Sequence, residues 1–245
     1  MPDKNGRPVV LSTRVLSDEL LQKLEDAGIS VKQHDFIQVS HEFDNNTFRE
    51  YLNNPDSQAR IFTSKNAVYS LEKLLASEAI EIQQKKNFTV GIKATEMLEE
   101  LGIETNARAG NAISLAQIIA RNKGLQSVDF FCGNKALDDL PEYLESKGIR
   151  VHKEIVYKTE LVPQRLNTAD IDAMIFLSPT AVYSFFKENN LNPKIPCFCI
   201  GATTSEAIHF RCDNKRIPSD EPTLESVIDK VIEHFGIQKF EDSKI

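Results

Sequence analysis

The sequence IFTSKNAVYS at Ile61–Ser70 occurs a second time in the chain as IFLSPTAVYS at Ile175–Ser184. Seven of the ten positions are identical, which chance does not explain. Each copy has the pattern of a short apolar strand, a polar turn and the start of a helix. The pair therefore predicts an internal duplication built from strand-and-helix units.

The similarity continues after both copies. A strand end, a glycine and a helix start follow at Val90–Glu96 and again at Ile200–Glu206. Farther along, the apolar helical pattern of Ser114–Ile119 matches that of Thr223–Ile228. We call this whole stretch repeat B, and it is present twice.

A second unit, repeat A, also occurs twice, because Leu20, Leu24 and Gly28–Val31 align with Leu140, Leu144 and Gly148–Val151 at a constant offset. It is predicted to run strand, turn, helix, glycine, strand. The predicted elements are Val9–Leu11, Asp18–Ala27 and Gly28 in the first copy, and Val128–Phe131, Leu137–Lys147, Gly148 and Val151–Tyr157 in the second.

The chain order is thus A, B, A, B, with a last amphipathic helix from Leu224 to Phe235 and Thr223 as its N-cap. Short β-rich runs that alternate with helical stretches predict parallel sheets covered by helices, and here two such α/β domains. Polar segments at Gln38–Asp44 and Lys158–Asn167 are candidate connectors. The repeats alone leave open whether the domains are sequential halves or interleaved.

Composition excludes several classes of protein. The chain has 245 residues, of which 41% are hydrophobic and 27% charged, so a disordered or collagen-like chain is excluded. The net charge of −7, with no block of basic residues, argues against binding to nucleic acid or anionic lipid. No segment has the length of a signal peptide core or a membrane span, so we expect a cytoplasmic protein.

Cysteine and histidine offer no motif. The four cysteines show no C-x-x-C spacing, which predicts free thiols and no metal site. The five histidines are scattered, and for each we expect a surface or satisfied core position.

Ligand-facing residues of parallel α/β sheets follow the carboxyl ends of the strands. The turns predicted there carry hydroxyls, amides, glycines, cations and helix N-termini, which suit carboxylates or phosphates. The same residue types cap helices, so any single one is better explained by capping than by ligand contact. The candidate ligand-binding residues are Thr13, Arg14, Ser64, Lys65, Asn66, Gly91, Lys93, Thr95, Gly133, Asn134, Ser178, Pro179, Thr180, Gly201, Thr203 and Thr204.

Motifs for nucleotide binding, hydride transfer, serine hydrolysis and metalloprotease chemistry are missing from the sequence. A site of hydroxyls, amides and cations without a nucleophile favours a ligand that reacts largely through its own reactivity. Such an enzyme would mainly position its substrate.

These stretches resemble the uroporphyrinogen-III synthase family, and the resemblance covers nearly the whole chain. The matching segments are Ile61–Val68, Phe131–Asn134, Leu140–Ile149, Ile155–Thr159, Phe176–Val182 and Ile200–Thr204. The resemblance implies two flavodoxin-like parallel α/β domains with internal duplication, joined by a two-stranded connector. It implies that residues 1–37 with 168–245 form the first domain and 43–157 the second, with 38–42 and 158–167 as connectors.

The resemblance also implies an activity. Linear hydroxymethylbilane would bind between the domains, lose its terminal hydroxyl as water, and close to uroporphyrinogen III through a spiro intermediate that inverts the last pyrrole. No cofactor or metal is implied. The expected partners are this small molecule and, transiently, the upstream bilane-forming enzyme, for a protein that is otherwise a monomer.

Site residues follow from the same resemblance. Tyr157 corresponds to the family tyrosine that faces the cleft and would donate the proton, although a strand tyrosine covering the sheet edge explains it equally well. Thr203 and Thr204 match the paired threonines of the family. Ala94 replaces the usual threonine of the first B repeat, so either Thr95 substitutes for it or that hydroxyl is dispensable. The alternative function is a non-catalytic binding or regulatory module with the same fold.

Overall fold

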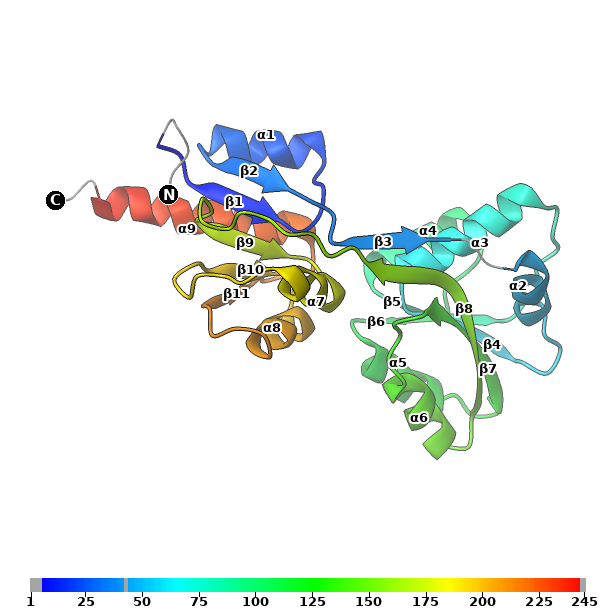
Figure 1. Ribbon diagram of the computed structural model, residues 1–245. Coiled ribbons are helices and arrows are strands. Elements are labelled where there is room, and N and C mark those ends of the chain that lie inside the picture. Colours follow the sequence, from blue (N-terminus) through cyan, green and yellow to red (C-terminus); the bar gives the residue numbers. More distant parts are fainter. Residues whose placement is uncertain (1–5, 42–43, 243–245) are drawn as a thin grey trace. The chain divides into compact units, whose positions relative to one another are not determined.

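The computed structural model describes residues 6–41 and 44–242, so residues 42 and 43 of the first predicted connector lie outside it. The chain divides into two compact units (Figure 1). Unit 1 comprises the described residues of Met1–Gln38 and Glu160–Ile245, and unit 2 comprises those of Val39–Thr159. The fold is a mixed α/β fold with parallel sheets, as the alternating pattern predicted.

Unit 1 is built on a five-stranded sheet in the order β11-β10-β9-β1-β2. All four strand pairings are parallel, for example Val10 beside Val31 of β2 and beside Ala173 of β9. The strands are β1 (Val9–Ser12), β2 (Ser30–Gln33), β9 (Ala173–Phe176), β10 (Cys197–Cys199) and β11 (Arg216–Pro218). The helices are α1 (Asp18–Asp26), α7 (Pro179–Glu188), α8 (Ala202–His209) and α9 (Leu224–Asp242).

Unit 2 contains most of a six-stranded sheet in the order β3-β8-β7-β4-β5-β6, with β4 to β8 paired in parallel. The strands are β3 (Ile37–Ser40), β4 (Ala59–Phe62), β5 (Lys86–Val90), β6 (Ala107–Ala109), β7 (Ser127–Gly133) and β8 (Arg150–Leu161). The helices are α2 (Asn45–Leu52), α3 (Lys65–Ser77), α4 (Ile92–Glu100), α5 (Ala112–Ala120) and α6 (Asp139–Ser146).

Both sheets place the two repeats in the same spatial order. In unit 1, the second and first strands of repeat A (β2, β1) are followed by the three strands of repeat B (β9, β10, β11). In unit 2, the corresponding order is β8, β7, then β4, β5, β6. The A copy comes before B along the chain in unit 1 and after it in unit 2.

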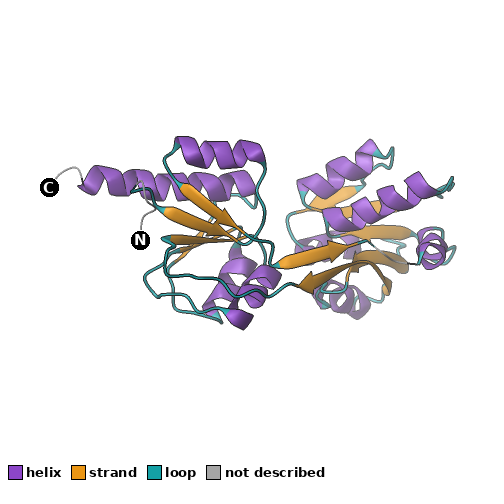
Figure 2. Ribbon diagram, turned by 45° about the horizontal axis from the view of Figure 1, so that its top comes forward, coloured by secondary structure: helices purple, strands orange, loops and turns teal. Residues whose placement is uncertain are grey.

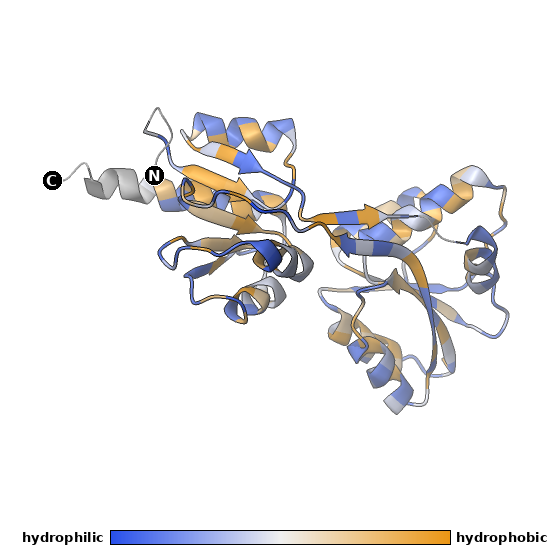
Figure 3. Ribbon diagram, in the orientation of Figure 1, coloured by the Kyte–Doolittle hydropathy of each residue, from blue (hydrophilic) through white to orange (hydrophobic). Residues whose placement is uncertain are grey.

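Helices cover both faces of each sheet, as Figure 2 shows. In unit 1, α1 and α9 pack on the face of Val10 and Ile175, while α7 and α8 pack on the face of Leu11 and Phe176. In unit 2, α5 and α6 cover one face, and α2, α3 and α4 cover the other. Because both faces are buried, the central strands are largely apolar, as the hydropathy colouring of Figure 3 shows for β1 and β9.

Several predicted boundaries require correction. The helix predicted at Leu137–Lys147 is α6, Asp139–Ser146, with Leu137 exposed ahead of it. The predicted connectors begin inside strands, because β3 includes Gln38 and β8 continues through Lys158 to Leu161. Helix α9 continues past Gly236. The predicted cap is confirmed, since the Thr223 hydroxyl accepts from the Ser226 amide at 3.2 Å.

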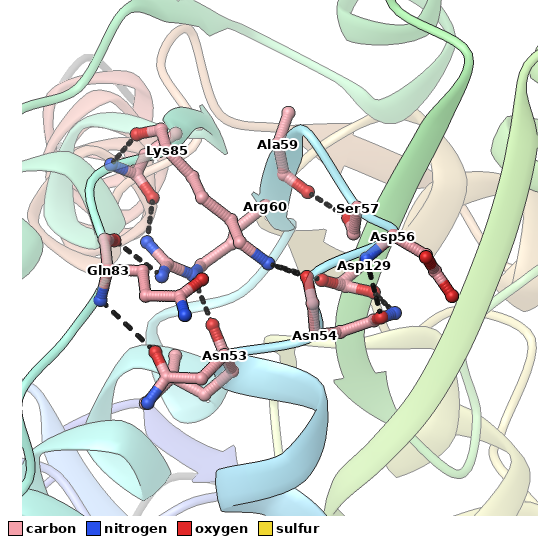
Figure 4. Close-up of polar contacts among 11 residues, drawn as sticks. Asn53, Asn54, Asp56, Ser57, Ala59, Arg60, Gln83, Lys85 and Asp129 are labelled. Carbon is pink, nitrogen blue, oxygen red and sulfur yellow. Dashed lines mark hydrogen bonds and ion pairs between the residues drawn. The ribbon is translucent and has the colours of Figure 1, made fainter.

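A buried charge cluster in unit 2 has no counterpart in the predictions. Arg60, in the middle of the sheet, is 1% exposed, and Lys85 and Asp129 are buried beside it (Figure 4). The Arg60 guanidinium donates to the carbonyls of Leu52 and Gln83, whereas the Lys85 ammonium lies 3.4 Å from the Asp129 carboxylate. Burial lowers the pKa of Arg60 to about 10, against the opposing effect of Asp129. Two cations thus share one buried anion.

In the described part of the chain, no helix combines the length and the apolar character needed to cross a membrane.

We predict that Asp129→Asn lowers the free energy of unfolding by about 3 kcal/mol, because it leaves two buried cations without their anion. Urea unfolding measures this. The matched control is Asp138→Asn, which breaks the exposed pair with Lys153 and should change stability by no more than about 0.5 kcal/mol. Equal effects of the two substitutions would contradict this view of the cluster.

Candidate functional site

The candidate residues lie at the carboxyl ends of the parallel strands in each unit. In unit 1, they follow β1, β9 and β10. In unit 2, they follow β4 and β5 or lie at the end of β7, and Tyr157 lies in β8. Parallel pairing brings the members of each group to one edge of their sheet. The cations of these turns, Arg14, Lys65, Lys93 and Lys135, are all exposed.

Two of the candidate serines cap helices. The Ser64 hydroxyl accepts from the Asn66 amide at 3.2 Å at the start of α3, and the Ser178 hydroxyl accepts from the Ala181 amide at 3.1 Å at the start of α7. These positions correspond in the two B repeats, so capping accounts for part of their similarity.

Three candidate threonines point into the protein. The Thr13 hydroxyl is buried and donates to the Ile175 carbonyl at 2.9 Å. The Thr95 hydroxyl lies 2.6 Å from that of Thr89 and 3.1 Å from the Gly91 carbonyl. Thr204 is 1% exposed, and Ala94, at the equivalent position of the first B repeat, is buried as well. Thr203, by contrast, is exposed in the first turn of α8, where backbone N–H groups are available to an anion.

Tyr157 is held against the backbone of β7. The strands β7 and β8 shift register after Cys132, and Gly133 then pairs with Tyr157. A Cβ atom at Gly133 would lie 2.4 Å from Cζ of Tyr157, so the ring occupies the space of a missing side chain. On the far side of the turn, the Asn134 amide donates to the Tyr157 carbonyl at 3.2 Å, and the Asn134 side chain bonds the backbone of Thr159.

This setting changes the acidity of the tyrosine. Burial raises the pKa of the Tyr157 phenol above its usual value, while a hydrogen bond with Ser64 acts in the opposite direction. The phenol is therefore protonated at neutral pH and able to donate a proton or a hydrogen bond.

His41 is a neighbour that the sequence reasoning missed. Its ring lies 4.7 Å from the Tyr69 ring and 6.1 Å from the Tyr157 ring, measured between centroids. Its Nδ1 atom is 2.8 Å from the Ser70 hydroxyl. No motif marks this histidine, because the residues around it come from positions 69 to 157 of the chain.

A pocket of about 720 Å³ lies at the opposite, amino edge of the sheet of unit 2. Arg60, Lys85 and the segment Leu101–Ile103 contribute to its lining. Arg60 already bonds backbone carbonyl oxygens, and Lys85 bonds the Asn54 carbonyl and pairs with Asp129, as Figure 4 shows. These bonds form a structural network that joins the turn after α2 to the sheet.

The described residues lack a cluster of metal-binding side chains. Among them, no group of three or more His, Cys, Asp or Glu residues is placed to hold a metal ion. The four cysteines are free thiols, and burial raises the pKa of Cys132 to about 11.

Comparisons with known proteins place this geometry in context. The family model described as uroporphyrinogen-III synthase HemD matches residues 5–229. A comparison with curated proteins gives no significant match.

Two solved structures share the fold. A mutant uroporphyrinogen III synthase from the extremely thermophilic bacterium Thermus thermophilus is 18% identical, with a TM-score of 0.73 over 95% of this chain and 99% of that one. The enzyme from Helicobacter pylori 26695 is 16% identical, with a TM-score of 0.61 over 93% of this chain and 99% of that one.

We predict that Gly133→Ala displaces the Tyr157 ring and moves the pKa of its phenol down towards the usual value of about 10, because the ring gains solvent. NMR of protein labelled at the tyrosine Cζ carbon measures this, with Tyr157→Phe identifying the signal. Gly110→Ala is the control, since an added Cβ there meets nothing within 4 Å. An unchanged Tyr157 pKa in Gly133→Ala would show that the position of the Tyr157 ring does not require the absence of a side chain at residue 133.

Proposed function

The chain belongs to the uroporphyrinogen-III synthase family, and on that premise we propose that it closes hydroxymethylbilane to uroporphyrinogen III with loss of water and inversion of the last pyrrole. The family assignment makes the chain an enzyme of porphyrin biosynthesis, a cyclising lyase, with a small-molecule substrate. The observation that carries the proposal is the family match over residues 5–229, together with a protonated tyrosine at the carboxyl edge of a parallel sheet.

In this proposal, Tyr157 donates the proton that the terminal hydroxyl needs in order to leave as water. Its raised pKa supports this role, because the phenol keeps its proton at neutral pH until a developing water molecule takes it. Ser64 and Gly133 then act as positioning residues for the Tyr157 ring.

The other candidate residues bind the acetate and propionate groups of the substrate. The exposed Thr203 hydroxyl and the N-terminal amides of α8 suit one carboxylate. Arg14, Lys65, Lys93 and Lys135 supply positive charge in a chain whose net charge is −7. Residues Asn66, Gly91, Asn134, Pro179, Thr180 and Gly201 shape the turns between these groups. The inward-pointing hydroxyls of Thr13 and Thr95 contribute through the backbone that they hold.

We also propose that the two units are duplicated flavodoxin-like domains, with β3 and β8 as the two-stranded connector. Their common strand order supports this. Each sheet has the second A strand, then the first A strand, then the three B strands in order, which corresponds to the flavodoxin-like order 2-1-3-4-5. We further propose a cytoplasmic monomer that receives its reactive substrate through transient contact with the bilane-forming enzyme.

The product formed tests the function. Purified protein is incubated with fresh hydroxymethylbilane, and the type III isomer is separated from the type I isomer that forms spontaneously. Type III as the main product is the expected result. Type I alone would overturn the proposal and leave a non-catalytic binding module as the function.

We predict that Tyr157→Phe lowers kcat for the type III product by about tenfold to a hundredfold, the low end of general-acid effects, because a weak acid assists a substrate that ionises readily. The measurement is the initial rate of type III formation at saturating substrate. A wild-type rate in Tyr157→Phe would remove the phenol from the mechanism. Complete loss in a folded variant would contradict a mechanism in which several donors share the task.

We predict that Arg14→Glu with Lys65→Glu raises KM for hydroxymethylbilane at least about tenfold, with a larger effect at low salt, because the substrate carries several carboxylates. Lys86→Glu with Lys123→Glu gives the same change in net charge away from the carboxyl edge and should leave KM within about twofold. Similar KM values for both double variants would show that the turn cations are not part of the site.

A further inference from the structure

His41 is fixed in place by a hydrogen-bonded serine. Its Nδ1 atom lies 2.8 Å from Oγ of Ser70, which is fully buried on α3. The same Oγ atom lies 2.6 Å from the carbonyl oxygen of Val156, the residue before Tyr157, and 3.0 Å from that of Asn66. One serine therefore joins the His41 ring to the strand that carries Tyr157.

This arrangement assigns the tautomer of His41. A hydroxyl has one proton, and a 2.6 Å contact between two oxygens requires that proton between them, so Ser70 donates to Val156. The Ser70 oxygen then accepts from His41, which means that Nδ1 carries the imidazole proton. In the neutral ring, Nε2 is left with a lone pair and is a proton acceptor.

The surroundings keep this ring neutral. The titratable groups placed against it are Tyr69 and Lys73 from α3 and Tyr157 from β8. Burial, followed by the charge of Lys73, lowers the pKa of His41 from its usual value. Lys73 itself lies over the Tyr69 ring, 5.3 Å from its centroid. At neutral pH, an uncharged base thus lies beside a protonated phenol.

Cyclisation of the substrate requires both a proton donor and a proton acceptor. The leaving hydroxyl takes one proton and departs as water. The free α-carbon of the last pyrrole forms the final ring-closing C–C bond, its C–H bond breaks, and that electron pair restores the aromatic ring as the proton leaves. One proton enters and one leaves, so the net change is the loss of one water molecule.

We propose that His41 is the base that accepts this second proton at Nε2 and returns it to the Tyr157 phenolate, so that both groups are reset after each turnover. The proposal rests on the synthase function stated above. It gives His41, the residue after β3, a catalytic role, and it makes Ser70 a positioning residue that holds the imidazole in the competent tautomer.

The test uses two amide substitutions. His41→Asn keeps an N–H group able to donate to Ser70 but has no basic nitrogen, and His41→Gln places an amide nearer the Nε2 position. In wild-type protein, kcat for type III should fall as pH drops below the His41 pKa, because the protonated ring cannot accept. In both variants, kcat at neutral pH should fall by about tenfold to a hundredfold, and this acid limb should disappear. His209→Asn, at an exposed histidine, is the control and should retain the wild-type profile.

Two outcomes would overturn the proposal. One is a wild-type rate in His41→Asn, and the other is a reduced rate with the acid limb unchanged, which would indicate positioning alone. A variant that does not fold leaves a direct measurement on the wild-type protein: ¹⁵N NMR of the imidazoles should show His41 protonated at Nδ1, and the Nε2-protonated tautomer would contradict it. Wild-type protein that forms no type III would instead refute the synthase function itself.

Discussion

Parallel strand pairing determines where the turns between strands and helices lie in both sheets. Each described pairing among β1, β2, β9, β10 and β11, and among β4 to β8, is parallel. Every turn from strand to helix must therefore emerge at the same edge of its sheet, which collects hydroxyls, helix N-termini and cations from distant parts of the sequence. The close approach of Tyr157 to Gly133 arises at that edge, where β7 ends and β8 continues.

Much of the fold could be predicted from the sequence, because the repeats carry it. The two copies of repeat A and of repeat B correspond to equivalent strands and helices, and Gly28 and Gly148 take positive φ angles of 75° and 78° after their helices. The repeats could not show which copy of repeat A shares a sheet with which copy of repeat B, since either copy of B would complete the strand and helix pattern of a domain. Arg60 also escaped prediction, because its burial depends on carbonyls of α2 and of the loop before β5.

The candidate site could be predicted as a set of turns but not as a set of side-chain directions. Whether a threonine after a strand points outward or inward depends on the residue at which the helix begins, which is why Thr203 is exposed and Thr204 buried. Ser64 illustrates a second limit, since it caps α3 and also bonds Tyr157, so a capping residue and a neighbour of the candidate acid are the same residue. The role of His41 could not be predicted either, because it depends on contacts with Ser70 and, through Ser70, with Val156, which are far away in sequence.

We propose that the tetrapyrrole binds the turns at the carboxyl ends of the strands and not the amino-edge pocket of unit 2. Amide hydrogen exchange, measured with and without uroporphyrinogen III, tests it most directly. We expect slower exchange in the turns at 63–66, 133–135 and 201–204 when the tetrapyrrole is present, with no change at 82–87 and 101–106. Protection at 82–87 and 101–106, with the carboxyl-edge turns unaffected, would contradict it.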